Sequence, residues 1–188
     1  MGQAPTTSSP EPSQAESYFL PQPLDAPTFA LTSHLGKPIS SRDFPERFLA
    51  VFFGYTFCPD VCPMTLTNLT EAFRLLGEDG ERVQVLLVSV DPARDTPEQL
   101  ARYLSNFHPS FLGLTGTEGQ IRHVADGFGA YFQANGEGER YTVDHTARIF
   151  IVSPDHKIPL TYPVTATAVE IARDLAELLS EEGATEKP

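Results

Sequence analysis

Residues 48–53 form a short, continuously apolar run that stops at Gly54, and beyond it the spacing of the apolar residues changes. A run of this kind is typical of a strand that is covered on both faces. From Pro63 to Leu76, apolar side chains recur every three to four residues, which predicts an amphipathic helix with proline at its first position. A buried strand that leads into a helix indicates an α/β fold.

The same alternation continues along the chain. Further strands are predicted at residues 83–90, 111–114, 146–152 and 158–162, and the last two are joined as a hairpin. Capping boxes at residues 96–99 and 117–120 open helices that extend to Phe107 and Phe132, and a final helix covers residues 167–180. This order predicts a central mixed β-sheet flanked by helices on both faces.

One folded domain is expected at residues 18–182. Residues 1–17 and 183–188 lack apolar periodicity, so we expect a flexible N-terminal segment and a flexible tail. The apolar runs are far shorter than the roughly 18 residues that a membrane-spanning helix needs. We therefore expect no transmembrane segment, and the N-terminal residues lack the basic and apolar regions of a signal peptide.

The charge balance bears on the class of partner. The chain has 13 basic and 25 acidic side chains, which gives a formal net charge of −12 at neutral pH. Binding to a polyanion needs a basic surface that releases counterions, and the sequence has no strong local cluster of basic residues. We therefore expect no nucleic-acid partner.

Cys58 and Cys62 are the only cysteines, and they lie four positions apart where the buried strand gives way to the helix. A structural disulfide usually closes a longer loop, so redox or metal chemistry is the better interpretation. If Pro63 begins the helix, Cys62 is its N-cap, and both sulfurs approach the positive helix end, which favours thiolates. The pair can form a disulfide or bind a soft metal ion, whereas two small buried apolar residues are the plainer alternative.

Five histidines are candidate partners for these sulfurs. His145 stands beside Asp144, just before the strand predicted at 146–152, and this sheet order brings that position near the cysteine turn. Two thiolates and an imidazole suit copper, although a polar residue at a strand edge would occupy the same position. The other four histidines occupy loops, turns or an amphipathic helix, and surface or packing roles are expected for them: His34, His108, His123 and His156.

Several acidic residues near these positions are less specific indicators of function. Residues 91–97 follow a strand and precede a helix, and an acidic turn that leads to an N-cap explains most of this segment. Asp60 and Asp144 are candidates for residues that orient the ligands or tune the charge on sulfur.

Three segments together resemble one known family. Residues 54–63 (GYTFCPDVCP), 90–97 (VDPARDTP) and 143–146 (VDHT) are similar to the Sco (SenC/PrrC) family of copper-binding assembly factors for cytochrome c oxidase, and the match spans residues 29–179. The cysteine block combined with the distal Asp-His-Thr is specific, whereas neither part is specific alone. The resemblance implies a thioredoxin-like fold in which Cys58, Cys62 and His145 bind copper, as Cu(I), Cu(II) or both.

The resemblance also implies a partner and a location. Members of this family deliver copper to the Cu(A) site of cytochrome c oxidase subunit II, or reduce the cysteine pair of that site. The Cu(A) domain is therefore the expected partner, and another copper chaperone is a candidate donor. Family members work in the periplasm or on the outer face of the inner membrane, usually held by an anchor. Because the sequence has no recognisable anchor, we expect a soluble domain of a membrane-anchored extracytoplasmic protein.

The chain departs from the family at residues 153–156, which read Ser-Pro-Asp-His where the family tends to have Asp-Pro-x-Gly. This difference leaves the copper ligands intact and affects only the hairpin and any partner contact there.

Two other functions are possible alternatives to that of a copper metallochaperone. One is a thiol-disulfide oxidoreductase, although Cys-x-x-x-Cys is one residue longer than the familiar redox dithiol. The other is a peroxiredoxin-like peroxidase, suggested by Thr56 before Cys58, but the upstream proline of that class is missing.

Overall fold

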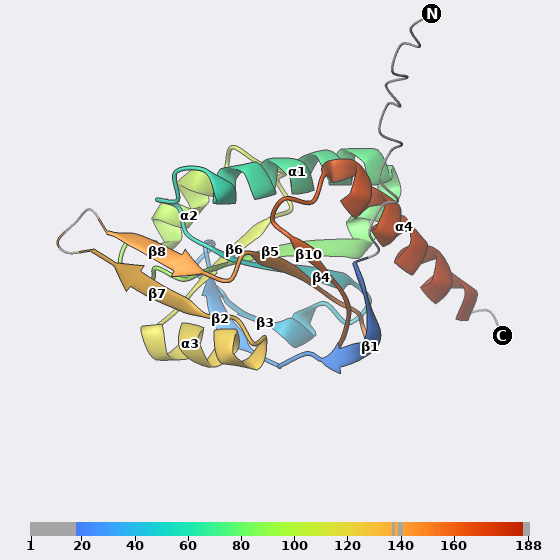
Figure 1. Ribbon diagram of the computed structural model, residues 1–188, viewed down its shortest axis with the longest axis horizontal. Helices are drawn as coiled ribbons and strands as arrows, with labels where there is room; N and C mark the ends of the chain where they lie inside the picture. The colour runs from blue at the N-terminus through green and yellow to red at the C-terminus, as the bar shows by residue number, and fades with distance from the viewer. Residues whose placement is uncertain (1–17, 137, 139–140, 186–188) are drawn as a thin grey trace, which may run out of the picture.

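The computed structural model describes residues 18–136, 138 and 141–185 (Figure 1). The N-terminal segment predicted to be flexible, residues 1–17, lies outside this range, and so do residues 186–188 of the predicted tail. The last helix is longer than its apolar pattern indicates: α4 spans Ala168–Thr185, five residues beyond the predicted end at residue 180.

The main sheet has eight strands among the described residues, in the order β1-β10-β9-β4-β5-β6-β2-β3. The central strands β4, β5 and β6 are parallel, whereas β9 pairs with β4 in the antiparallel direction. The predicted mixed sheet is thus confirmed. The strands are β1 (Phe19–Asp25), β2 (Ala30–Ser33), β3 (Pro38–Ser40), β4 (Phe48–Gly54), β5 (Val83–Ser89), β6 (Leu112–Thr115), β9 (Arg148–Val152) and β10 (Lys157–Pro163).

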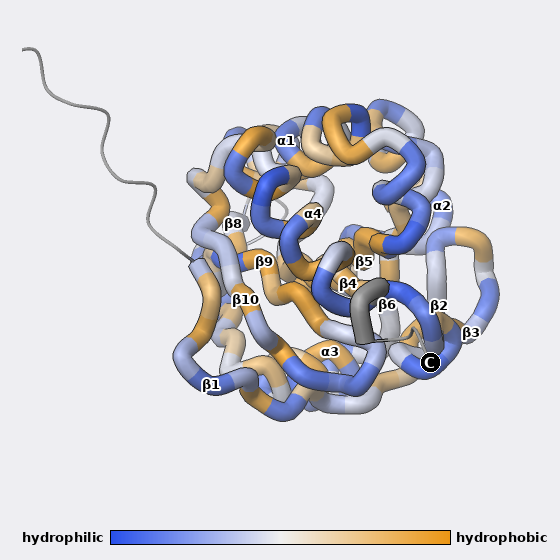
Figure 2. The backbone as a smooth tube through the Cα atoms, turned by 90° about the vertical axis from the view of Figure 1, so that its right-hand side faces the viewer, coloured by the Kyte–Doolittle hydropathy of each residue, from blue (hydrophilic) through white to orange (hydrophobic). Residues whose placement is uncertain are grey.

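Helices cover both faces of this sheet, as predicted. Figures 1 and 2 show α1 (Val61–Leu76), α2 (Pro97–Leu104) and α4 on one face and α3 (Glu118–Gly127) on the other. Two short 3₁₀ helices, at Ser41–Asp43 and Gly77–Arg82, complete the described elements. In the part of the chain that the structure describes, no helix has the length and apolarity required to cross a membrane.

The core lies around β4 and β5, and every residue of both strands is buried. Figure 2 shows the hydrophobic stretches gathered on the central strands, with hydrophilic ones toward the outside. From α1, Leu66, Leu69 and Phe73 pack onto this core, which is the face that their three-to-four spacing predicts. The continuous apolar runs are therefore explained by burial on both faces of the sheet.

Three strands at the sheet edges were not predicted. β1 is largely exposed, and β2 and β3 have only four and three residues. β1 has no fully buried side chain, and β2 and β3 are too short to show a run of apolar alternation, so strand prediction has little signal there.

The prediction of a helix up to Phe132 is wrong. α3 ends at Gly127, and Gly129, with a φ of +63°, adopts the left-handed conformation that commonly terminates helices. Phe132 instead begins β7 (Phe132–Asn135), which pairs with β8 (Thr142–His145) in a separate two-stranded ribbon. The ribbon projects beyond the main sheet in Figure 1. A buried phenylalanine four residues after Phe128 satisfies the helical period, so the sequence pattern alone does not reveal the turn.

Candidate metal centre

The cysteine segment leaves the carboxyl end of β4, in the middle of the main sheet. α1 begins at Val61 with Asp60 as its N-cap, so the prediction that Cys62 caps the helix and Pro63 begins it is wrong. Proline lacks an N–H group, but none of the first-turn N–H groups has an acceptor within the helix, so Pro63 is tolerated there. The helix therefore starts two residues earlier and includes Cys62 in its first turn.

Cys62 is completely buried, and its sulfur lies against the backbone at the end of β4. A Cβ atom added to Gly54 would lie 3.1 Å from Cys62 Sγ and 2.9 Å from a ring carbon of Phe52. Burial raises the pKa of the Cys62 thiol well above its usual range. The expectation that the helix end favours a thiolate is thus not met at Cys62, because loss of hydration outweighs the backbone hydrogen bond from Tyr55 that lowers the pKa.

Cys58 is half-buried, and its sulfur accepts a hydrogen bond from the Cys62 backbone N–H at 3.4 Å. This N–H belongs to the first turn of α1, so the positive helix end is directed at the Cys58 sulfur. Both cysteines are free thiols. Cys58 and His145 line one cavity of about 300 Å³, together with Tyr55, Val61, Val143, Asp144 and Ala147.

His145 reaches the same place from the end of β8. The prediction placed His145 just before a strand at residues 146–152, whereas the structure places it at the end of β8, and β9 begins only at Arg148. Because Phe52 pairs with Ile149 across β4 and β9, the residues just before β9 lie beside the carboxyl end of β4. The expected proximity of His145 to the cysteine turn follows from this register.

The imidazole of His145 presents its Nε2 atom to the Cys62 sulfur at 3.8 Å. Its Nδ1 atom lies 3.2 Å from the carbonyl oxygen of Thr146. Because a carbonyl only accepts, Nδ1 carries the proton and the lone pair of Nε2 faces the sulfur. Burial lowers the pKa of His145, and the rings of Phe52 and Tyr55 pack edge-on against the imidazole. The ring is therefore held neutral, which is the state that binds metal.

The distance between Nε2 and the Cys62 sulfur can be compared with that in a metal complex. With bonds of about 2.3 Å to sulfur and about 2.0 Å to nitrogen, a trigonal centre would separate the two atoms by about 3.7 Å. Among the described residues, no three His, Cys, Asp or Glu side chains already form a complete metal site. The Cys62 sulfur and His145 Nε2 are thus spaced as two ligands of one metal ion would be.

The two acidic residues singled out from the sequence lie on different elements, Asp60 at the N-terminus of α1 and Asp144 on β8. Asp60 is exposed, and its side chain makes no capping hydrogen bond to α1. Asp144 lines the same cavity as Cys58 and His145, and its carboxylate accepts a hydrogen bond from Asn135 across the ribbon. Asp144 therefore adds negative charge at the cavity, whereas Asp60 lies at the helix end.

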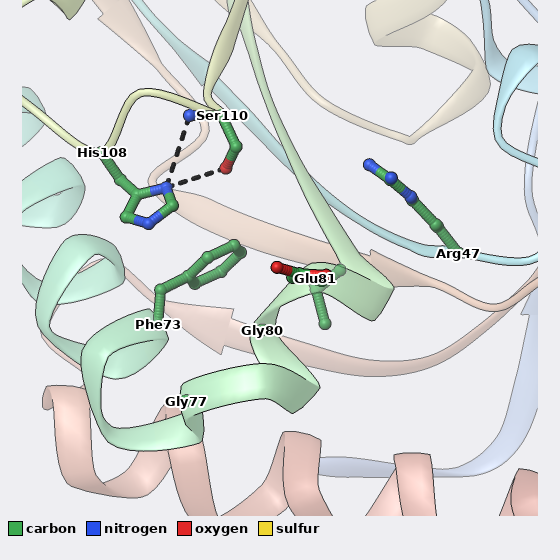
Figure 3. A pocket seen from close by; sticks show the side chains of 8 residues that line it. Arg47, Phe73, Gly77, Gly80, Glu81, His108 and Ser110 are labelled. Atoms are coloured by element: carbon green, nitrogen blue, oxygen red, sulfur yellow. Dashed lines mark hydrogen bonds between the residues drawn. The ribbon is translucent and has the colours of Figure 1, made fainter.

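The remaining histidines lie elsewhere, as expected. His108 lines a separate cavity of about 290 Å³ at the amino ends of β4 and β5, where its Nδ1 atom lies 2.8 Å from Ser110 Oγ (Figure 3). His34 Nδ1 accepts a hydrogen bond from the Gly113 N–H at 3.1 Å. His123 is exposed on α3, and His156 occupies the turn between β9 and β10.

Sequence reasoning missed several residues around the cysteines. The buried Tyr55 hydroxyl accepts a hydrogen bond from the Val143 N–H of β8 at 3.2 Å. Residues 91–97 form more than an acidic turn, since Asp91, Arg94 and Asp95 all contact segments that carry the cysteines or the histidine. One sequence feature could have indicated this role: an arginine stands between two aspartates at the strand-to-helix turn that neighbours the cysteine turn.

Comparison with known proteins gives consistent matches. The SCO1/SenC family model matches residues 21–180. The mitochondrial SCO2 homolog of Mus musculus is 34% identical over 151 residues, which cover 78% of this chain and 59% of that protein. Across three mitochondrial SCO2 proteins, the matched region covers 44–59% of their lengths, so the chain spans about half of these relatives.

Solved structures give the same result. Bradyrhizobium japonicum ScoI with copper bound is 35% identical, with a TM-score of 0.75, and the match covers 81% of this chain and 98% of that one. BsSco, described as a member of the Sco family of cytochrome c oxidase assembly proteins with a disulfide switch, is 25% identical with a TM-score of 0.70, over 88% and 99% of the chains. These likenesses confirm the thioredoxin-like α/β fold predicted from the sequence.

Proposed function

Because the chain belongs to the SCO1/SenC family, we propose that it is a copper metallochaperone that binds copper through Cys58, Cys62 and His145 and assists assembly of the Cu(A) site of cytochrome c oxidase. The observation that carries this proposal is the 3.8 Å approach of the bare Nε2 atom of His145 to the Cys62 sulfur. Two sulfurs hold Cu(I), and the imidazole nitrogen extends the site to Cu(II). The copper-bound relative ScoI supports the same metal.

The different burial of the two sulfurs suggests how copper is taken up and released. Cys62 is the buried sulfur, whereas Cys58 lies on the loop at the open cavity that His145 also lines, and we take Cys58 as the donor that moves. An incoming thiolate can enter through this cavity, bond to copper and then displace Cys58. No electron changes hands in this exchange, because one thiolate replaces another.

The proposed partner is the Cu(A) domain of oxidase subunit II, and another copper chaperone is a candidate donor. Large apolar side chains are exposed on three segments next to the site: Phe57 on the cysteine loop, Met64 on the first turn of α1 and Tyr131 beside Thr146. Exposed apolar groups around a polar centre are typical of protein docking surfaces. The proposed location is extracytoplasmic, with the domain anchored to a membrane in the full-length protein; the anchor is supported by a Bacillus anthracis relative described as an SCO1/SenC family lipoprotein.

Metal binding tests the proposal directly. Equilibrium dialysis of the reduced protein against Cu(I) should give one copper per chain. We expect His145→Ala to weaken binding and Cys58→Ser or Cys62→Ser to abolish it, whereas His123→Ala, on the exposed face of α3, should bind like the wild type. Binding that survives both His145→Ala and alkylation of both cysteines would reject the proposal. Transfer is then measured by mixing the loaded protein with a reduced, metal-free Cu(A) domain.

A second function, thiol-disulfide oxidoreductase, is supported by the contact between Cys58 Sγ and the Cys62 N–H and by the disulfide switch of the relative BsSco. In this reaction a Cys58 thiolate attacks an oxidised Cu(A)-site disulfide and forms a mixed disulfide. Cys62 then resolves it, so one disulfide forms here while the partner gains two thiols. His145 is dispensable in this chemistry.

The two functions are separated by kinetics. The rate of thiol exchange with an oxidised Cu(A) domain, measured by stopped flow, should be low and insensitive to His145→Ala if copper delivery is the function. Rapid exchange by the copper-free protein, together with a reduction potential low enough to reduce that domain, would favour the reductase. The peroxidase alternative predicts consumption of hydrogen peroxide by the reduced protein, and we expect none.

A further inference from the structure

The two halves of the candidate site lie on elements that do not share a sheet. The cysteines follow β4 of the main sheet, whereas His145 ends β8 of the separate β7-β8 ribbon. A metal site needs its donors held at a defined separation. The ribbon therefore requires tertiary contacts that fix it relative to the cysteine loop.

The Arg94 side chain lies between these two halves. Its guanidinium carbon is 3.6 Å from the ring centroid of Tyr141, just before β8, and 4.7 Å from that of Phe57 on the cysteine loop. Both distances are within the range of cation–π interactions. The same guanidinium donates a hydrogen bond from Nη1 to the Tyr141 carbonyl at 3.0 Å. Arg94 thus contacts both the loop of Cys58 and the ribbon of His145.

A buried carboxylate holds this guanidinium in place. Asp91 accepts hydrogen bonds from Arg94 Nε and from the Tyr141 hydroxyl, one on each of its oxygens. The side chain of Asp91 is 2% exposed and that of Arg94 is 17% exposed, so the pair is shielded from water. A shielded, multiply bonded guanidinium is more rigid than an exposed one, because water cannot replace its partners.

The turn that carries Arg94 is itself fixed to the start of the cysteine loop. The fully buried Asp95 accepts hydrogen bonds from the Thr56 hydroxyl at 2.6 Å, from the Thr56 N–H at 3.0 Å and from the Ser89 hydroxyl at 2.6 Å. Gln99 adds a further bond to the Thr56 hydroxyl at 3.0 Å, instead of closing the capping box predicted at 96–99. The turn therefore moves with the cysteine segment rather than independently of it.

From these contacts we propose that Arg94 is a positioning residue that sets the place of His145 relative to the cysteine pair. Asp95 fixes the turn to Thr56, and Arg94 then reaches across to Tyr141 on the chain entering β8. The inference rests on the proposed function, since it concerns copper binding by the same three residues. It assigns a role to a segment that the sequence alone presents as an ordinary turn.

A double-mutant cycle on Cu(I) affinity tests this role. The four proteins are wild type, Arg94→Gln, His145→Ala and the double variant, with affinities measured by competition against a chromophoric Cu(I) chelator. We expect Arg94→Gln to weaken binding about 10- to 100-fold when His145 is present, as for other residues that orient metal ligands. In the His145→Ala background, the same change should have no effect. Arg74→Gln, which removes an exposed charge on α1, is the matched control.

The outcomes separate the positioning role from a structural one. If Arg94 merely supports the fold, its substitution will weaken binding equally in both backgrounds, and the proposal is overturned. Unchanged affinity of Arg94→Gln overturns it as well. If His145→Ala alone binds like the wild type, it is the proposed ligand set that fails. If Arg94→Gln does not fold, Arg94→Lys replaces it in the double-mutant cycle, because lysine keeps the positive charge but lacks the planar pair of hydrogen-bond donors.

A spectroscopic readout accompanies the cycle. In the Cu(II)-loaded protein, electron paramagnetic resonance detects coupling to the nitrogen of His145. We expect this coupling to be reduced in Arg94→Gln and in Tyr141→Phe. The second variant removes only the hydroxyl group that donates a hydrogen bond to Asp91. Full nitrogen coupling in both variants would contradict a role for the Asp91–Arg94–Tyr141 contacts in placing the imidazole.

Discussion

The Nε2 atom of His145 lies 3.8 Å from the sulfur of Cys62, although 83 positions separate the two residues in the chain. Cys62 is fully buried and His145 is half-buried; loss of hydration raises the pKa of the thiol and lowers that of the imidazole, so each is held in its neutral form. A neutral pair avoids the cost of burying unpaired charge in the metal-free protein. In the proposed function, copper has to displace the thiol proton when it binds.

That displacement predicts a pH dependence of copper binding. Because the Cys62 thiol keeps its proton well above neutral pH, each copper bound releases that proton, and the apparent affinity should rise about tenfold per pH unit from this group. The measurement is chelator competition between pH 6 and pH 8. An apparent Cu(I) affinity that does not change between pH 6 and pH 8 would show that Cys62 is not a proton-releasing ligand.

The two cysteines should differ in reactivity in the metal-free, reduced protein. Cys62 is fully buried with a raised pKa, whereas Cys58 is half-buried beside an open cavity, so a soluble alkylating agent should modify Cys58 first. Mass spectrometry of peptides after short exposure to iodoacetamide measures the order. Equal or faster labelling of Cys62 would mean that the segment opens in solution.

Gly54→Ala should disturb the site through a single methyl group. The added Cβ would lie 2.9 Å from the Phe52 ring and 3.1 Å from Cys62 Sγ, so the sulfur or the ring has to shift. We expect a loss of about 1–3 kcal/mol in the free energy of unfolding, typical of overpacking, and weaker Cu(I) binding.

Gly119→Ala provides the control for this substitution. Gly119 lies in α3, and a Cβ atom there would meet no atom within 4 Å. Because alanine favours helix, this variant should be as stable as the wild type or up to about 1 kcal/mol more stable. If chemical denaturation finds the two variants equally stable, Gly54 is not needed for the close approach of the sulfur.

The half-buried imidazole of His145 predicts how the stability of the metal-free protein changes with pH. Burial lowers the pKa of His145 in the folded state, so below its ordinary pKa of 6.5 the unfolded chain takes up a proton that the folded chain resists. The contribution of His145 to the free energy of unfolding is complete above pH 6.5, and it is lost as the pH falls through the pKa of His145 in the folded state. Urea unfolding at pH 7.5 and pH 5.5 should therefore show a smaller decrease for His145→Asn than for the wild type. An equal decrease would mean that His145 is solvated.

The ribbon shows where sequence patterns stop being informative. Phe132 falls at helical spacing after Phe128, yet it is buried from a strand, because Gly129 turns the chain out of the helix first. The start of α1 is a similar case. Proline is common at the first helical position, but any first-turn position accepts it, so Pro63 does not mark the helix start.

Local patterns in the chain were sufficient to predict the buried central strands, the helices between them, the cysteine turn at the end of β4 and the candidacy of Cys58, Cys62 and His145. The strands, the helices and the cysteine turn depend on neighbours a few positions away, whereas the candidacy of His145 depends on the predicted order of the strands and on the resemblance to the family. The separation of His145 from the sulfurs, the burial that protonates Cys62 and the contacts of Arg94 were decided by tertiary structure alone. The position of His145 and the contacts of Arg94 arise from the pairing of β4 with β9 and from the packing of the β7-β8 ribbon on the distant turn at residues 91–97. The protonation of Cys62 arises from its loss of hydration, which depends on all the residues that pack around the sulfur.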